Sequence, residues 1–126
     1  MEMTSNLLRL QEAKSVSVSD HEPGTIIEVV AERDSIFLVV VVSPEDDEVV
    51  VKGKAGPYNE GLRYATLHGA FLGSVIRTGC IAEGAGVRFD LAAGGTLQVL
   101  KVVHFAVRSG REDIEEGDRI IAAAAN

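Results

Sequence analysis

The feature that most constrains the fold is a run of seven consecutive apolar residues at positions 36–42, with the sequence IFLVVVV. Valine and isoleucine are branched at Cβ, which suits a pleated strand better than a helix. Because neighbouring side chains of a strand point to opposite faces, both faces of this strand are apolar and both must be covered. We therefore expect a central strand that lies between two layers of the fold or against another subunit.

Valine is frequent along the rest of the chain as well, and its spacing predicts a protein built from strands. Short polar or glycine-containing segments separate the apolar stretches, so consecutive strands are expected to pair antiparallel. The predicted strands occupy residues 14–19, 25–31, 35–43, 48–52, 62–68, 71–78, 87–91 and 96–108. This pattern predicts an all-β fold, a small single-domain antiparallel β-barrel or β-sandwich with a meander in its N-terminal half and little or no helix.

The connections between these strands carry their own predictions. The polar residues 32–34 predict a hairpin between the second and third strands, and residues 92–95 (AAGG) predict a tight turn between the last two. The segment that begins at Gly53 and ends at Gly61 is predicted to be the longest irregular loop and a candidate binding loop.

The C-terminal segment is less regular than the rest. Residues 116–118 (EGD) predict a turn that leads into a final short strand at residues 119–121. We expect residues 1–126 to form one domain, with poorly ordered ends at residues 1–12 and 122–126.

Composition narrows the class of protein. Hydrophobic residues make up 46% of the chain and charged residues 25%, which is enough apolar material for a packed core. The single cysteine, Cys80, cannot form an intrachain disulfide, as expected for a cytoplasmic protein or for a virion component if the chain derives from a phage. The apolar runs are far shorter than the ~20 residues of a membrane-spanning helix. A net charge of −7 disfavours general nucleic-acid binding.

Residues that could carry catalysis or bind a metal show no recognisable arrangement. A thiol nucleophile at Cys80 would need a histidine such as His68 or His104 and an orienting group such as Asp90, but no family signature surrounds the cysteine. The histidines and Cys80 lack metal-ligand spacing. We therefore predict no catalytic residues, no metal site and no cofactor, and a non-enzymatic role is favoured.

Two arginines and two histidines are the candidate ligand-binding residues. Arg88 follows a Gly-Ala-Gly turn whose backbone amides could hold an anion, and His68 ends a strand just before Gly69, where backbone can approach a ligand. Strand alternation places His104 on an apolar face with Val102. The candidates are His68, Arg77, Arg88 and His104.

Lys101 interrupts an apolar face, if strand alternation continues from Val99 to Val107. A charge in that position is typical of a protected sheet edge or of a subunit interface. The candidate interface residues are Phe37, Val39, Val41 and Lys101.

Three functions remain open from the sequence. The favoured one is a non-enzymatic assembly or interaction domain that self-associates, such as an accessory structural protein of a phage particle or scaffold. The alternative is a small-molecule or nucleotide-binding β-barrel that uses the loop from Gly53 to Gly61 with Arg77 and Arg88 to hold a small anionic ligand. The least supported is a hydrolase or isomerase built on His104, Cys80 and Asp90.

Overall fold

The computed structural model describes residues 2–56 and 61–125, so part of the predicted loop from Gly53 to Gly61 lies outside the described residues. The helices are α1 (Glu2–Glu12) and α2 (Arg111–Ala124), with two 3-10 turns, η1 (Val18–Asp20) and η2 (Pro44–Asp46). The strands are β1 (Ser15–Ser17), β2 (Ile26–Ala31), β3 (Ser35–Ser43), β4 (Glu48–Ala55), β5 (Leu62–Leu72), β6 (Val75–Thr78), β7 (Cys80–Ala82), β8 (Gly86–Leu91), β9 (Thr96–Val99) and β10 (Val102–Arg108).

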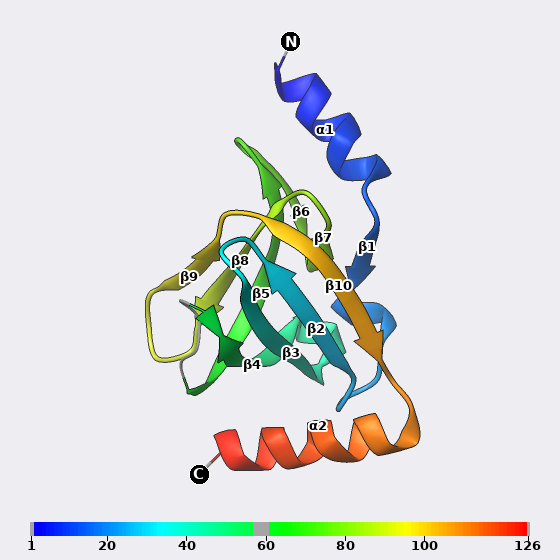
Figure 1. The fold of residues 1–126 in the computed structure, drawn as a ribbon, viewed down its shortest axis with the longest axis vertical. Coiled ribbons are helices and arrows are strands. Elements are labelled where there is room, and N and C mark those ends of the chain that lie inside the picture. Colours follow the sequence, from blue (N-terminus) through cyan, green and yellow to red (C-terminus); the bar gives the residue numbers. More distant parts are fainter. Residues whose placement is uncertain (1, 57–60, 126) are drawn as a thin grey trace.

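Most of the strands belong to one antiparallel sheet that curls around the core (Figure 1). Its order is β10-β2-β3-β4-β5-β8-β9, with β6 added beside β5, while β1 and β7 form a separate two-stranded ladder. The mostly-β, antiparallel fold and the meander from β2 to β5 are confirmed. The sheet is not a closed barrel.

The prediction of little or no helix is wrong, because helices account for 25% of the chain. Residues 116–121 were expected to form a turn and a strand but belong to α2. Within α2 the residues that face the sheet recur at helical spacing: Gly117, Ile120, Ile121 and Ala124. Residues 2–12, expected to be a poorly ordered end, are described as α1.

Strand β3 lies inside the sheet, with a layer on each face. Phe37, Val39 and Val41 point into the main core, which the curled sheet encloses. Leu38 and Val40 point the other way, into a second apolar cluster that α2 completes through Ile120. The expectation that both faces of this strand are covered is confirmed, and the cover comes from the same chain.

Helix α2 can approach the sheet closely because two glycines meet at the contact. A Cβ added to Gly117 would lie 1.9 Å from the carbonyl oxygen of Gly24, which is far inside the van der Waals limit. At the start of the helix, Arg108 Nη2 donates to Glu116 Oε2 at 2.6 Å and Arg108 Nε donates to Asp113 Oδ1 at 3.1 Å. Burial lowers the pKa of the Arg108 guanidinium, but these two carboxylates outweigh burial and raise it overall.

The first helix covers a different part of the sheet, at the opposite end of the molecule from α2 (Figure 1). Leu10 of α1 is buried in a small cluster with Ala70 and Ala82. Leu7 and Leu8 remain exposed. Within residues 2–56 and 61–125, no helix is long and apolar enough to cross a membrane.

Several local predictions are confirmed. Strands β2 and β3 form the predicted hairpin, and β8 and β9 pair across the turn at residues 92–95. The predicted strand at residues 96–108 is instead two strands, β9 and β10, which break at Leu100 and Lys101. A register shift between Val102 and His104 then buries Val102 in the core and leaves His104 exposed, so they do not share a face as strand alternation had predicted.

Candidate functional site

The structure brings two of the four predicted ligand-binding residues together and separates the other two. His68 on β5 and Arg88 on β8 both contact Asp90. Arg77 on β6 instead contacts β1, where its Nη1 donates to Ser15 Oγ at 3.0 Å. His104 lies on β10 and contacts Glu83. The cluster of His68, Arg88 and Asp90, called the polar cluster below, is therefore the part of the prediction that forms a common site.

Strand pairing explains why the polar cluster forms. Arg88 lies opposite Gly69, and Asp90 lies opposite Thr66. The register shifts between Leu67 and Gly69, so His68 is an extra, unpaired residue. This bulge brings the His68 ring to Asp90, with Nδ1 of the histidine 3.3 Å from Oδ2 of the carboxylate.

Gly69 is required at the bulge for two reasons. Its φ of +151° is one that side chains with a Cβ rarely adopt, and an added Cβ would lie 2.2 Å from the carbonyl oxygen of Arg77. From the sequence, we expected the glycine after His68 to allow close approach of the backbone to a ligand. In the structure, Gly69 instead allows close approach of strand β5 to strand β6.

The polar cluster is half open to solvent and its hydrogen bonding is incomplete. The side chains of His68, Arg88 and Asp90 are 34%, 41% and 47% exposed. Arg88 Nε lies 3.8 Å from Asp90 Oδ1, which is within ion-pair range but too long for a hydrogen bond. The Nε atom itself is buried and has no hydrogen-bond partner. A buried N–H without a partner is costly, so a ligand or water with an acceptor atom that reaches this N–H would be favoured.

A cavity lies farther along the same two strands. It has a volume of about 360 Å³ and is lined by Leu62, Arg63, Tyr64, Leu91, Ala92, Ala93 and Gly94. Ala92 N donates to Tyr64 O at 2.9 Å, just beyond the last β5–β8 pair, Ala65 with Leu91. Asp90 of the polar cluster pairs with Thr66 across β5 and β8. Thr66 is two residues from Tyr64, and Asp90 is two residues from Ala92, so the cavity lies close to the polar cluster along the strands. Apart from the turn at residues 92–95, no local pattern in the sequence indicates this cavity.

Cys80 is enclosed in a different region. It is 1% exposed, and its thiol donates to Thr78 O at a sulfur-to-oxygen distance of 3.7 Å. Burial raises the pKa of the Cys80 thiol, although the nearby charge of Arg77 acts in the opposite direction. A protonated, enclosed thiol is a poor nucleophile.

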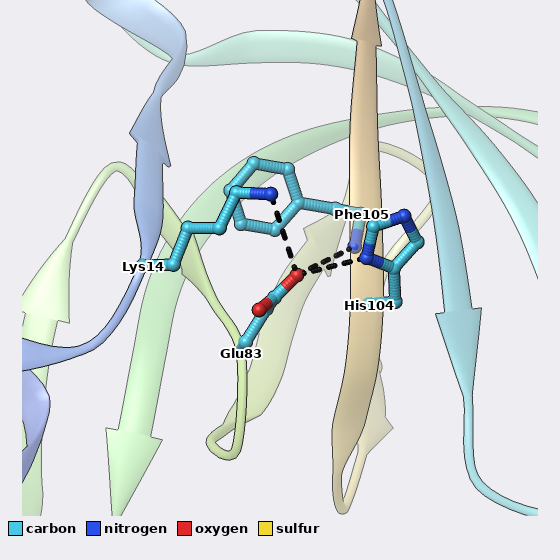
Figure 2. A network of polar contacts seen from close by, with 4 residues as sticks. All are labelled: Lys14, Glu83, His104 and Phe105. Carbon is cyan, nitrogen blue, oxygen red and sulfur yellow. Dashed lines mark hydrogen bonds and ion pairs between the residues drawn. The ribbon is translucent and has the colours of Figure 1, made fainter.

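Glu83, in the turn between β7 and β8, joins this turn to edge strand β10 (Figure 2). Its Oε2 atom accepts a hydrogen bond from Phe105 N at 3.4 Å and lies 3.0 Å from His104 Nδ1 and 3.8 Å from Lys14 Nζ. The Lys14 ammonium also lies 5.2 Å from the centre of the Phe105 ring. We call these contacts of Glu83 with His104, Phe105 and Lys14 the Glu83 clasp. The clasp engages backbone and side-chain groups of the edge strand β10 and accounts for the position of His104.

The predicted interface residues lie in two different environments. Phe37, Val39 and Val41 are at most 1% exposed, so they offer no surface to a partner. Lys101 is exposed in the connection between β9 and β10. Its neighbours Leu100 and Val103 are 64% and 54% exposed, the two highest values among the large hydrophobic side chains that the structure describes.

Cys80, His104 and Asp90 do not contact one another in any polar contact that the structure shows, so they do not form a catalytic arrangement. His104 contacts Glu83, Asp90 contacts His68 and Arg88, and the Cys80 thiol bonds to Thr78 O. Among residues 2–56 and 61–125, no three histidine, cysteine or carboxylate side chains gather as a metal site would require.

Comparison with known proteins adds no functional assignment. No protein-family model matches the chain, and no curated protein and no solved structure matches it.

Proposed function

We propose that this protein is a non-enzymatic β-domain that binds a small molecule along strands β5 and β8. One observation carries the proposal: an apolar cavity of about 360 Å³ lies two residues along the same strand pair from the polar cluster of His68, Arg88 and Asp90. Ligand sites in proteins are typically concave and mostly apolar, with a few polar groups that fix the orientation of the ligand.

The polar cluster supports this proposal through its chemistry. A neutral His68 that donates Nδ1–H to Asp90 leaves Nε2 as an acceptor, while Arg88 supplies donors. Together the three side chains can donate to and accept from one polar ligand group. Without Arg88, the Asp90 carboxylate would repel an anion, so the ion pair between Arg88 and Asp90 also widens the range of ligands that the site can hold.

Ligand binding is favoured over self-association because α2 covers the second apolar face of strand β3, the face that carries Leu38 and Val40. Strand β3 therefore needs no second subunit to cover its apolar faces. The volume of the cavity also stands near the lower end of the usual 300–1,000 Å³ range for ligand sites, which favours a compact ligand over a nucleotide.

The test is thermal denaturation of the protein against a panel of small polar and amphiphilic compounds. A ligand present at 100 times its Kd adds about 2.7 kcal/mol to the free energy of unfolding, which is readily measured. The rise in melting temperature should shrink in His68→Ala and in Ala93→Leu, which narrows the cavity, and should persist in Arg111→Gln. Arg111 is a suitable control because its side chain is 93% exposed and pairs with Glu115 on α2. A panel without a stabilising compound, or equal stabilisation of every variant, would contradict the proposal.

Self-association is the second candidate, and the exposed residues Leu100, Lys101 and Val103 favour it. Three of the six large hydrophobic side chains that are exposed in the described chain lie between Leu100 and Val107. Exposed apolar side chains that gather on one segment often mark contact surfaces. Light scattering during size-exclusion chromatography should then report a dimer or larger species that Leu100→Ser with Val103→Ser converts to a monomer. A monomeric wild-type protein at tens of micromolar would exclude this candidate.

A further inference from the structure

The polar cluster is part of a wider polar surface that crosses four neighbouring strands, β4, β5, β8 and β9. Residues directly opposite each other on antiparallel strands point to the same face of the sheet. Here the opposite residues are polar on both strands: Glu48 with Thr66, Thr66 with Asp90, Asp90 with Thr96, and Arg88 with Gln98. A ligand on this surface, called the polar face below, therefore meets hydrogen-bonding side chains from all four strands.

An aromatic residue of β5 stands at each end of the polar face. Tyr64, two residues from Thr66, lines the apolar cavity and donates its hydroxyl to Ile121 O of α2 at 3.5 Å. At the other end, Phe71 lies opposite Gly86, and its ring fills the position that a Cβ at Gly86 would take. Both aromatic residues are half-buried. The polar side chains therefore lie between two apolar surfaces on one face of the sheet.

The charges that point to this face cancel over β5, β8, β9 and the stretch of β4 that pairs with β5. Glu48 and Asp90 are acidic, while Arg88 is basic. Lys52 points to the same face as Glu48, four residues along β4, and is exposed. This balance is local, because the whole chain carries a net charge of −7 with histidine counted as neutral. An ion of either sign would meet a like charge here, so a ligand without a net charge is favoured.

Arg88 and Asp90 have hydrogen-bonding capacity that their present contacts do not use. The Arg88 Nε–H is buried and has no partner. The Asp90 carboxylate lies 3.3 Å from His68 Nδ1 and 3.8 Å from Arg88 Nε, both longer than the about 2.7–2.9 Å of a strong charge-assisted bond. A hydroxyl group can donate one hydrogen bond and also accept. Adjacent hydroxyls of one ligand can therefore donate to Asp90 and accept from Arg88.

We propose that the polar face binds a neutral hexose, whose adjacent hydroxyls hydrogen-bond to Asp90 and Arg88 and whose apolar C–H face lies against Tyr64. This inference deepens the proposed function and rests on it. A sugar combines many hydroxyls, no net charge and an apolar ring face, which are the three properties that this surface favours. A wholly apolar ligand would leave the Arg88 Nε–H without a partner, which is costly.

The experiment compares D-glucose, D-galactose and D-mannose with the uronate and the 2-amino sugar of each. The uronate and the amino sugar keep the ring but add a negative or a positive charge. Each probe is titrated into ¹⁵N-labelled protein, and the amide shifts of residues 64–66, 88–92 and 96–98 are followed. At least one neutral hexose should shift these amides saturably and bind at least about threefold more tightly than its two charged analogues, because like charges repel.

Variants of the polar face test the assigned contacts. Asp90→Asn should weaken binding of that hexose at least about tenfold, as expected for loss of a hydrogen bond to a charged group. Arg88→Lys keeps the charge but removes Nε–H and should also weaken binding, whereas Arg111→Gln on α2 should leave it unchanged. Exposed ion pairs add little stability, so both site variants should fold, and the dispersion of their amide spectra checks this. If one variant does not fold, the other decides.

The outcomes separate this inference from the proposed function. If no hexose shifts these amides but another compound of the wider panel does, the sugar assignment is wrong while the binding site stands. A uronate or an amino sugar that binds as tightly as the neutral hexose would also overturn the assignment, as would unchanged hexose affinity in the folded Asp90→Asn or Arg88→Lys variant. If neither a sugar nor any compound of the wider panel shifts these amides, the inference and the proposed function both fail.

Discussion

Replacing Gly117 with alanine should destabilise the protein, although alanine is the better helix former. At an exposed position inside a helix, Gly→Ala gains up to about 1 kcal/mol. At Gly117 the new Cβ would lie 1.9 Å from Gly24 O and 2.7 Å from the carbonyl carbon of Gly24. Ordinary contact begins at 3.4 Å, so α2 must move about 1.5 Å from the sheet, which is the difference between 3.4 Å and the 1.9 Å distance to Gly24 O.

The cost of this shift can be estimated from what α2 covers. Overpacking of this kind costs about 1–3 kcal/mol, and partial loss of Ile120 burial, which is worth about 1.5–3 kcal/mol when complete, adds to it. Ile120 is 7% exposed and belongs to the cluster with Leu38 and Val40. After subtraction of the helix-propensity gain, we expect a net loss of about 2 kcal/mol, or about 8 °C in melting temperature for a chain of this length.

Urea denaturation followed by circular dichroism measures this loss directly. The matched control is the pair Arg119→Ala and Arg119→Gly, at an exposed position two residues further along α2, which gives the propensity difference without a contact. A second readout is light scattering, because a displaced α2 exposes the apolar face of β3 and should promote association. A Gly117→Ala variant as stable as the wild type would refute the reasoning that close contact with Gly24 positions the helix.

Three further predictions concern the turn between β2 and β3, the buried thiol and the Glu83 clasp. Arg33 and Asp34 both have positive φ in the turn, a conformation that Asn-Gly adopts at lower cost, so the Arg33→Asn/Asp34→Gly variant should gain about 1 kcal/mol in chemical denaturation; a less stable variant would show that the wild-type turn is not strained. Because burial raises the pKa of the Cys80 thiol, the folded state retains its proton more tightly than the unfolded chain, and the free energy of unfolding should fall as pH rises above about 8.5. This decline should be smaller in Cys80→Ala, and an identical decline in both proteins would argue against it. Glu83→Ala leaves Phe105 N without its acceptor and should cost about 1–2 kcal/mol and speed hydrogen exchange of the Phe105 amide, whereas Glu83→Gln should have a smaller effect; exchange at the wild-type rate in Glu83→Ala would rule out the clasp.

The parts of the fold that the sequence predicts are those determined by neighbouring residues. The strand at residues 36–42 follows from β-branched residues in an unbroken run, and the turn at residues 92–95 follows from two consecutive glycines. The C-terminal helix could not be predicted in the same way. Gly117 within an acidic segment is typical of a turn, and the reason for a glycine there is its contact with Gly24, 93 positions earlier.

The candidate site was predicted in part for a similar reason. His68 could be selected because it directly precedes Gly69, and Arg88 because it follows Gly84 and Gly86 closely. Their common partner, Asp90, depends on the register between β5 and β8 and on the bulge at His68, which no local pattern specifies. The cavity depends on where the β5–β8 ladder ends, and Arg63, which lines it, was not among the predicted ligand residues.

The most direct test of the account is to map ligand contacts by amide chemical shifts across the whole described chain, with compounds that raise the melting temperature. Ligand binding along β5 and β8 predicts saturable shifts concentrated at Leu62, Tyr64, Asp90 and Gly94, with little change at Leu100 or Val103. Shifts concentrated at Leu100 and Val103 instead, or line broadening there that increases with protein concentration in the absence of ligand, would contradict the account and favour self-association.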